Sequence, residues 1–248
     1  MKLVKRFLRP FLIALFWIGV WELCAHLYAK PLIFPAPRAV CVRLFELMGT
    51  WEFYRITLHS LWRILLGIVV AIVIGSLLAF LTARVKILRE LVLPLMTVIK
   101  ATPVASFIIL MWLLIGARNL PTFITMLIVI PVVWTNLDEG FSQIDPKLSE
   151  MTRVYGMPPL RRLTVLTLPS LRPYFTSACR TSLGLAWKAG VAAEVIATPL
   201  CSIGTEITGA KTYMEYEDLF AWTLTVILLS LLMELIFARL LREKREGV

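Results

Sequence analysis

Residues 64–83 read ILLGIVVAIVIGSLLAFLTA, and this stretch decides the fold class of the chain. It contains no charged side chain, and about 20 apolar residues are what an α-helix needs to cross the hydrocarbon core of a bilayer. Gly67, Ala71, Gly75 and Ala79 recur at every fourth position and share one helix face, where a second helix can approach closely. The stretch therefore predicts a membrane-spanning helix that packs on a neighbour through small residues.

The composition of the whole chain agrees with a membrane protein. The 248 residues are 59% hydrophobic and 17% charged, whereas a soluble domain is roughly 45–50% apolar and about 25% charged. The net charge of +10 is typical of basic cytoplasmic loops facing anionic lipid, and no basic soluble segment interleaved with aromatic residues is present to bind nucleic acid. We expect an all-α integral membrane protein with about six spans.

Further predicted spans flank the first stretch. The earliest, residues 7–28, lacks a small-residue cleavage site after it, so we interpret it as a retained helix and not as a signal peptide. The prolines of residues 34–37 stop any helix, and residues 38–48 predict a short interfacial helix. The third span, residues 91–115, is interrupted by Pro94 and by Thr102-Pro103, which predicts a bent or discontinuous start. The other spans are residues 120–134, 176–197 and 219–241.

The distribution of Lys and Arg predicts the orientation. Sixteen of these residues lie on the side that holds both termini and the long polar segment 136–173, and seven lie on the other side. Arg55 and Arg63 belong to the seven, in the segment before the span at residues 64–83. Because cytoplasmic loops carry the excess of positive charge, we expect a multi-pass protein of the cell inner membrane with both termini cytoplasmic.

The polar segment contains the most specific pattern of the chain. From Ser149 it reads SEMTRVYGMPPLRRLTVLTLPSLRPYF. Ser149 is the predicted N-cap of a first helix, and Gly156, with Pro158 and Pro159 behind it, ends that helix. A second helix over residues 160–168 is expected to stop at Pro169. The pattern predicts two short helices joined at a glycine elbow, a cytoplasmic surface on which a soluble partner would dock.

This segment resembles the EAA loop of bacterial ATP-binding-cassette (ABC) import permeases, whose pattern is E-A-A, three residues, Gly, nine residues, Ile-x-Leu-Pro. The matching positions are Glu150, Met151 and Thr152 for E-A-A, Gly156 for the glycine, and Leu166, Leu168 and Pro169 at the end. The spacing fits without a gap, although both alanines are replaced and Leu stands for Ile. The resemblance implies a coupling loop that binds an ATPase subunit.

The resemblance covers roughly residues 30–240 and points to the nitrate/sulfonate/taurine branch. FPAP (34–37), HSLWRILLG (59–67), KATPVASFIILMWLLIG (100–116) and LGLAWKAGVAAEVIA (183–197) are similar to that branch. One departure is that Cys201-Ser202-Ile203-Gly204 keeps only the last glycine of a Gly-Leu-Gly turn. The resemblance implies a type I ABC importer permease fold with a cytoplasmic coupling helix. Residues 1–55 would form an N-terminal transmembrane helix plus the interfacial helix, and residues 56–248 the permease core with its EAA-like loop 149–169.

The resemblance also implies the partners. Two copies of the chain would form the pathway, a dimer of ATPase subunits would lie below them, and an extracytoplasmic solute-binding protein would deliver the solute. The phosphate-binding pattern GxxxxGK[ST] is absent, so we expect ATP to be bound by the partner. The chain itself is expected to be a transport subunit with no cofactor and no enzymatic activity.

Charged residues inside the predicted spans are candidates for the translocation pathway. Lys188 and Glu194 lie in the fifth span, and a charge at the bilayer centre usually faces protein or a water-filled cavity. Either they line the pathway, or they form a structural ion pair with a neighbouring helix. Lys100, beside Thr102-Pro103, either faces the pathway or extends to the cytoplasmic surface. These alternatives stay open at the level of sequence.

The remaining reactive residues form no cluster. Cys24, Cys41, Cys179 and Cys201 have no CxxC spacing, and His26 and His59 stand alone, so no metal site is predicted. Cys41 and Cys201 both face outward in the predicted topology and could pair.

The substrate is expected to be a small solute, with an anion such as nitrate, a sulfonate or taurine in first place and a thiamine precursor or other metabolite as the alternative. A membrane-embedded enzyme would need a catalytic constellation that the spans lack. An ion-coupled secondary transporter would show internal repeats, and it would leave the glycine elbow unexplained.

Overall fold

The computed structural model describes residues 2–28 and 33–240, and this part of the chain is helical without a β-strand. The helices are α1 (Lys2–Tyr28), α2 (Pro37–Met48), α3 (Trp51–Arg84), α4 (Lys86–Ala101), α5 (Val104–Ile115), α6 (Leu120–Ser142), α7 (Pro146–Val154), α8 (Pro159–Arg162), α9 (Leu168–Ala197), α10 (Ile203–Thr212) and α11 (Tyr216–Leu240), with a π-helical turn η1 (Leu163–Thr167) before α9. The predicted all-α class is confirmed. Lys30 and the basic tail (Arg242, Lys244, Arg245) lie outside the described residues.

Three of the described helices, α3, α6 and α11, are long and apolar enough to cross a membrane. The pair α4 and α5 meets the same standard only when its two helices are taken together. In α1 the apolar stretch is shorter, Leu15–Leu27. Helix α9 is 30 residues long, but it carries Lys188, Glu194 and further charges and does not meet the standard. The predicted spans therefore all correspond to helices, which differ in how apolar they are.

A sharp bend of 104° separates α4 from α5. Thr102 is extended at this point, with ψ 133°, because the ring of Pro103 disfavours the helical conformation in the residue before it. The predicted discontinuous start of the third span is confirmed. The predicted interruption at Pro94 is wrong, since α4 continues through that residue. A proline inside a helix removes one hydrogen bond, and the remaining turns of α4 tolerate this loss.

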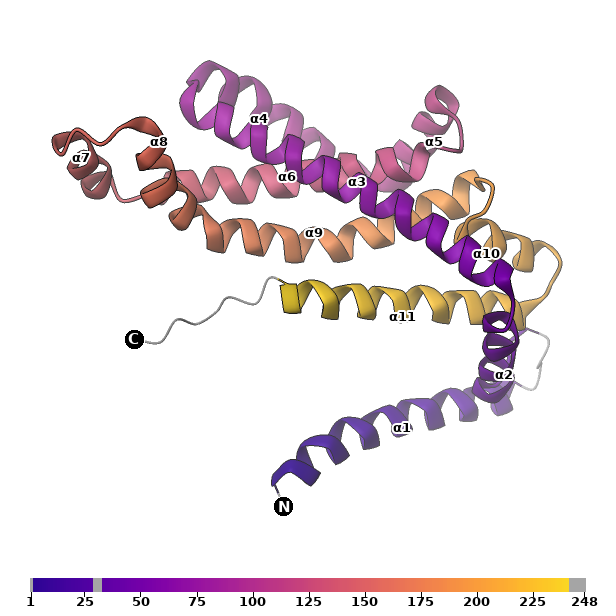
Figure 1. The fold of residues 1–248 in the computed structure, drawn as a ribbon. Helices are drawn as coiled ribbons and strands as arrows, with labels where there is room; N and C mark the ends of the chain where they lie inside the picture. The colour runs from indigo at the N-terminus through magenta and orange to yellow at the C-terminus, as the bar shows by residue number, and fades with distance from the viewer. Residues whose placement is uncertain (1, 29–32, 241–248) are drawn as a thin grey trace.

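Helix α6 lies between α3 and α9 and forms the centre of the bundle (Figure 1). The predicted small-residue face of α3 packs on α6. A Cβ atom on Gly67 would lie 2.6 Å from the carbonyl oxygen of Thr122, and one on Gly75 would lie 2.9 Å from the Cβ of Val133. The two backbones approach so closely that no side chain fits at these glycines, which confirms the prediction from residues 64–83.

Helix α3 begins at Trp51, 13 residues before the predicted start of its span. The Thr50 hydroxyl caps the helix by accepting a hydrogen bond from the Phe53 backbone N–H at 3.3 Å. Arg55 and Arg63 therefore lie on a helix and not in a loop, which corrects the sequence interpretation. The extension is stabilised by buried side chains at helical spacing, among them Phe53, Ile56 and Ser60. The expected domain boundary between residues 55 and 56 falls inside this helix.

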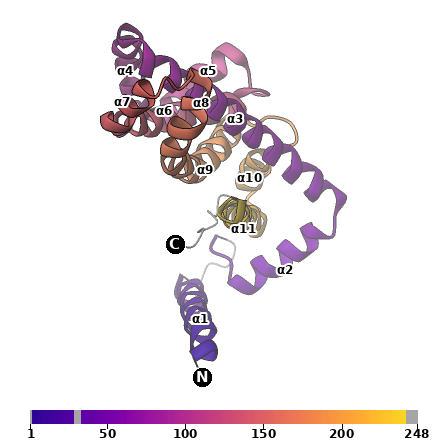
Figure 2. The same cartoon turned by 60° about the vertical axis from the view of Figure 1, so that its left-hand side comes forward.

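The helix ends sort into two groups. The N-terminal end of α1, the C-terminal end of α11 and the α7–α8 segment lie toward one end of the molecule, and α2 and α10 lie toward the other (Figure 1). Most of helix α1 stands apart from the bundle (Figures 1 and 2). It is joined to the bundle through α2 and through Trp21, which stacks on Phe220 of α11. Arg43 on α2 donates hydrogen bonds from Nε and Nη2 to the carboxylate of Asp218 on α11, the latter at 2.9 Å, so α2 is fastened to the bundle.

Helix α9 continues from the turn before it, so the predicted stop at Pro169 is wrong. Arg162, Leu163, Thr167 and Leu168 are all right-handed helical, and the Leu168 N–H donates to the carbonyl of Leu163 five residues earlier. Proline lacks an N–H and crowds the carbonyl four residues before it. The wider π-helical turn directly before Pro169 accommodates both effects.

Candidate functional sites

The α7–α8 segment forms the glycine elbow predicted from the sequence. Gly156 has a left-handed φ of 61°, and the turn carries both hydrogen bonds of a Schellman motif. The Gly156 N–H donates to the Arg153 carbonyl at 3.0 Å and the Met157 N–H donates to the Thr152 carbonyl at 3.0 Å. No atom lies within 4 Å of the position that a Gly156 Cβ would take. The backbone conformation, and not a lack of space, therefore requires glycine here.

The start of α7 differs from the prediction. The N-cap is Asp145, whose carboxylate accepts from the Lys147 backbone N–H at 2.8 Å, and not Ser149. Pro146 at the first helical position favours this earlier start. Ser149 lies inside α7 instead, where its hydroxyl accepts a hydrogen bond from Arg162 of α8. This bond links the two arms of the elbow.

The predicted coupling residues separate into inward-facing and exposed groups. Thr152 is buried, and its hydroxyl donates to the Ser149 carbonyl at 2.8 Å. Glu150, Met151, Gly156, Leu168 and Pro169 are exposed. Large apolar side chains lie beside them and face outward, with 85% of Val154, 79% of Tyr155 and 79% of Leu160 exposed. The elbow therefore presents apolar and charged groups together at one end of the molecule.

Two cavities lie at this end of the molecule, one among α3, α6 and the start of α9 and the other between the elbow and the bundle. One of about 880 Å³ is lined by Leu168 and Pro169 together with Phe80 of α3 and Phe141 of α6. The other, of about 340 Å³, is lined by Phe80, Phe141 and Met157 among others. The second cavity leaves open space between the elbow and α3 and α6.

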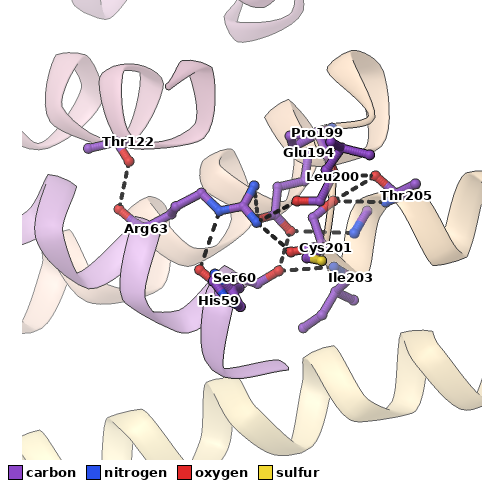
Figure 3. Close-up of polar contacts among 12 residues, drawn as sticks. His59, Ser60, Arg63, Thr122, Glu194, Pro199, Leu200, Cys201, Ile203 and Thr205 are labelled. Atoms are coloured by element: carbon purple, nitrogen blue, oxygen red, sulfur yellow. Dashed lines mark hydrogen bonds and ion pairs between the residues drawn. The ribbon is translucent and has the colours of Figure 1, made fainter. Parts of the chain in front are cut away.

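A second polar site lies near the opposite end of α9, around Glu194 (Figure 3). Glu194 is fully buried, and one carboxylate oxygen accepts from the Ser60 hydroxyl at 2.8 Å and the Gly204 N–H at 3.4 Å. Its other oxygen lies 3.9 Å from Arg63 Nη1. The Ser60 hydroxyl also accepts from the Ile203 N–H at 2.9 Å. We call Ser60, Arg63 and Glu194 the outer polar network.

The outer polar network holds the segment between α9 and α10. Arg63 Nη2 donates to the carbonyl oxygens of Leu200, at 3.0 Å, and Cys201. Thr198 and Cys201 both have left-handed φ angles, of 45° and 52°, which are unfavourable for non-glycine residues. The hydrogen bonds from Arg63 offset this strain and fix the path of the segment.

The two candidate pathway lysines are in different surroundings. Lys188 is exposed on α9. Lys100, at the end of α4, is also exposed, and its ammonium group donates to the Thr135 hydroxyl of α6 at 2.7 Å. Glu194 differs from both lysines because its side chain is fully buried in the single chain. The structure thus separates residues that the sequence analysis grouped together.

Sequence reasoning missed the roles of Ser60 and Arg63. They lie three residues apart on α3, and Arg63 directly precedes the charge-free stretch. The predicted span began only at residue 64, so the helical spacing of Ser60 and Arg63 was not considered, although positions three apart lie on the same face of a helix. The four cysteines are free, and Cys41 and Cys201 form no disulfide in the described chain.

The family described as "Binding-protein-dependent transport system inner membrane component" matches residues 71–246. This range includes the glycine elbow, Lys188 and Glu194. The chain belongs to this family of transport permeases. The permease is thus a transport component of an ABC importer, a class that is not an enzyme in itself, and it is a multi-pass protein of the inner membrane.

Several permeases are similar over most of their length. A probable ABC transporter permease of Haemophilus influenzae is 26% identical over 91% of this chain and 92% of its own. The taurine transport system permease of Escherichia coli is 24% identical over 87% of this chain and 80% of its own. The bicarbonate transport system permease of Synechococcus elongatus is 27% identical over 75% of this chain and 67% of its own. The predicted branch is confirmed.

A solved structure also has the same fold. It is the crystal structure of a bacterial ABC transporter involved in the import of the acidic polysaccharide alginate, and it superposes with a TM-score of 0.64 at 17% identity. The match covers 99% of this chain and 100% of the other. The predicted type I importer fold is therefore confirmed.

Proposed function

We propose that the permease imports a small anion into the cytoplasm, driven by a separate ATPase dimer that docks on the α7–α8 elbow. The observation that carries this proposal is the Schellman turn at Gly156, which presents Val154, Tyr155 and Leu160 to solvent. Large exposed apolar side chains around a rigid turn are typical of a protein-binding site. ATP is bound by the partner, and the permease contributes no cofactor.

The elbow is suited to transmit movement. Its arms are linked by the Arg162–Ser149 hydrogen bond, so a force on Met151 or Tyr155 moves α7 and α8 together. The chain then continues through η1 into α9 without a loop. Movement of the ATPase subunits would thus be passed along α9 into the membrane, where two copies of the permease rock between inward-open and outward-open states.

The proposed topology has both termini and the elbow in the cytoplasm. The start of α1, the end of α11 and the elbow lie toward one end of the molecule (Figure 1), and the excess of Lys and Arg predicted from the sequence supports a cytoplasmic position for that end. The opposite end, with α2 and α10, would receive solute from an extracytoplasmic binding protein.

The anionic substrate is supported by the relatives and by charge. The names of two relatives give bicarbonate and taurine as the solutes that those two proteins transport. The name of a Bacillus subtilis relative gives aliphatic sulfonates. Lys188 is an exposed cation on a membrane helix, so we propose that it lines the pathway. For Glu194, burial and the Arg63 contact favour the structural ion pair. For Lys100, the bond to Thr135 favours a position at the helix end outside the pathway.

Substituting Gly156 tests the docking role. We expect Gly156→Val to reduce copurification with the ATPase subunit at least tenfold, because a β-branched residue is strained at this φ. Gly156→Asn is the matched control, since asparagine adopts the left-handed conformation more easily, and it should retain most of the binding. The measurement is the amount of ATPase subunit recovered with the full-length permease, and the uptake of bicarbonate, taurine and an alkanesulfonate per ATP hydrolysed.

A second substitution examines the carboxylate at the start of the motif. Glu150→Ala should retain the helix and reduce uptake per ATP hydrolysed. Unchanged copurification and unchanged uptake in both Gly156→Val and Glu150→Ala would contradict a docking role for the elbow.

A further inference from the structure

Between residues 177 and 188 the exposed residues of α9 are mostly polar or cationic, and Leu185, 43% exposed, is the large apolar exception. Ser177, Thr181, Gly184 and Lys188 are exposed, and their spacing of three or four residues places them on one side of the helix. Arg180, also exposed, borders the same stripe. The stripe extends for roughly 16 Å along the helix at 1.5 Å per residue. We call these five residues the α9 polar face.

The exposed faces of the other long helices have the opposite character. On α3 the exposed large side chains within residues 64–83 are apolar: Leu66, Val69, Val73, Leu77 and Leu81. On α11 they are Ile227, Leu228, Leu231, Leu232, Leu235 and Ile236, and Glu234 is the exposed charged residue among them. These faces suit contact with lipid chains. The α9 polar face does not, because charged groups inside a membrane face protein or water and not lipid.

The two cations of the α9 polar face have no partner within the part of the chain that the structure describes. Arg180 lines a cavity of about 450 Å³ between α9 and α11, and Glu234 of α11 lines the same cavity without forming an ion pair. A buried structural charge would be paired, as Glu194 is with Arg63. The absence of an ion-pair partner for Arg180 and Lys188 indicates that water solvates these side chains or that they are available to bind a ligand.

The symmetry of a dimer adds a second argument. In a two-fold dimer the same surface of both copies meets across the axis. If the α9 polar faces meet there, Arg180 and Lys188 of one copy approach the same cations of the other. Such like charges repel in a dry interface, whereas a water-filled gap between them concentrates anions.

We propose that the α9 polar face lines the water-filled translocation pathway, and that Arg180 and Lys188 attract the anionic solute there. This inference rests on the proposed function and deepens it, because it assigns Arg180 to the pathway and ties the sign of the substrate charge to two residues. The small side chains Ser177, Thr181 and Gly184 leave the width of the pathway open between the cations.

Cysteine accessibility tests the water-filled pathway. In the full-length permease with Cys24, Cys41, Cys179 and Cys201 replaced, coexpressed with its ATPase, single Ser177→Cys and Thr181→Cys variants are treated with a water-soluble methanethiosulfonate. The matched controls are Val69→Cys and Val73→Cys on the exposed face of α3. We expect modification on α9 to be at least tenfold faster than on α3. Equal rates on the two helices would overturn the proposal, because a lipid-facing or dry surface excludes the reagent.

The charge of the reagent tests the role of the cations. Rates with a sulfonate-bearing and a trimethylammonium-bearing reagent are compared at the Thr181→Cys position, each divided by the rate with a small free thiol. The normalised ratio is expected to favour the sulfonate reagent and to fall at least threefold when Arg180→Gln or Lys188→Gln is added. Glu234→Gln should raise it. A ratio that favours the cationic reagent, or that both lysine and arginine variants leave unchanged, would overturn the anion-attracting role.

These outcomes are distinguishable from a failure of the proposed function. Binding of the ATPase to the Gly156 elbow is measured by copurification. This binding does not depend on which face of α9 is accessible to water. If copurification persists while α9 resists modification, the pathway assignment is wrong and the permease role remains. If the ATPase subunit does not copurify with the wild-type permease, the proposed function itself is wrong.

Discussion

Replacing Glu194 with alanine is expected to destabilise the permease by about 3 kcal/mol, because removing one partner of a buried ion pair leaves the other without compensation. Glu194 is fully buried, and the Arg63 side chain is only 14% exposed. The substitution also removes the acceptor for the Ser60 hydroxyl and the Gly204 N–H. The measurement is the unfolding midpoint of the purified permease in detergent, by denaturant or heat.

The matched control is an ion pair at the same end of the molecule that is exposed to solvent. Glu52 and Arg55 are paired on the surface, with 58% and 48% of their side chains exposed. Glu52→Ala should change the unfolding midpoint far less, because exposed ion pairs contribute little to stability. The double variant Arg63→Leu/Glu194→Leu should recover part of the loss, since it removes both charges. Equal effects of Glu194→Ala and Glu52→Ala would mean that the outer polar network contributes no special stability.

Gly204→Ala is expected to destabilise the permease by about 3 kcal/mol or more, the upper part of the range for overpacking. A Cβ at this position would lie 2.3 Å from the Glu194 carbonyl carbon and 2.3 Å from the Val195 nitrogen. These are backbone atoms of α9 that cannot rotate away. Helix α10 would have to move outward, which would break the hydrogen bond of the Ile203 N–H to Ser60.

Gly209→Ala is the control within the same helix. No atom lies within 4 Å of its Cβ position, so alanine should fit and could add up to about 1 kcal/mol through its higher helix propensity. Both variants are compared with wild type in the same unfolding assay. If Gly204→Ala unfolds at the wild-type midpoint, the result contradicts the close contact between α9 and α10.

The candidate sites were predictable to different degrees. The elbow at Gly156 follows from local chemistry, since only glycine easily takes the left-handed conformation that a Schellman turn needs. The helix start was missed because Asp145 and Pro146 form a stronger start signal than Ser149. The outer polar network was not predictable, because Ser60 and Glu194 lie 134 residues apart and nothing in the sequence pairs them.

The sequence by itself determined the membrane class, the presence of most of the helices though not all of their ends, and the position of the elbow. These properties depend on the transfer of apolar side chains out of water and on backbone preferences within a few residues. Both effects are set by residues that are close together in the sequence. The tertiary structure alone decided which charges are paired. Whether Glu194 is buried against Arg63 while Lys188 and Arg180 stay exposed depends on how α3, α9, α10 and α11 pack, and packing brings together residues that are distant in sequence.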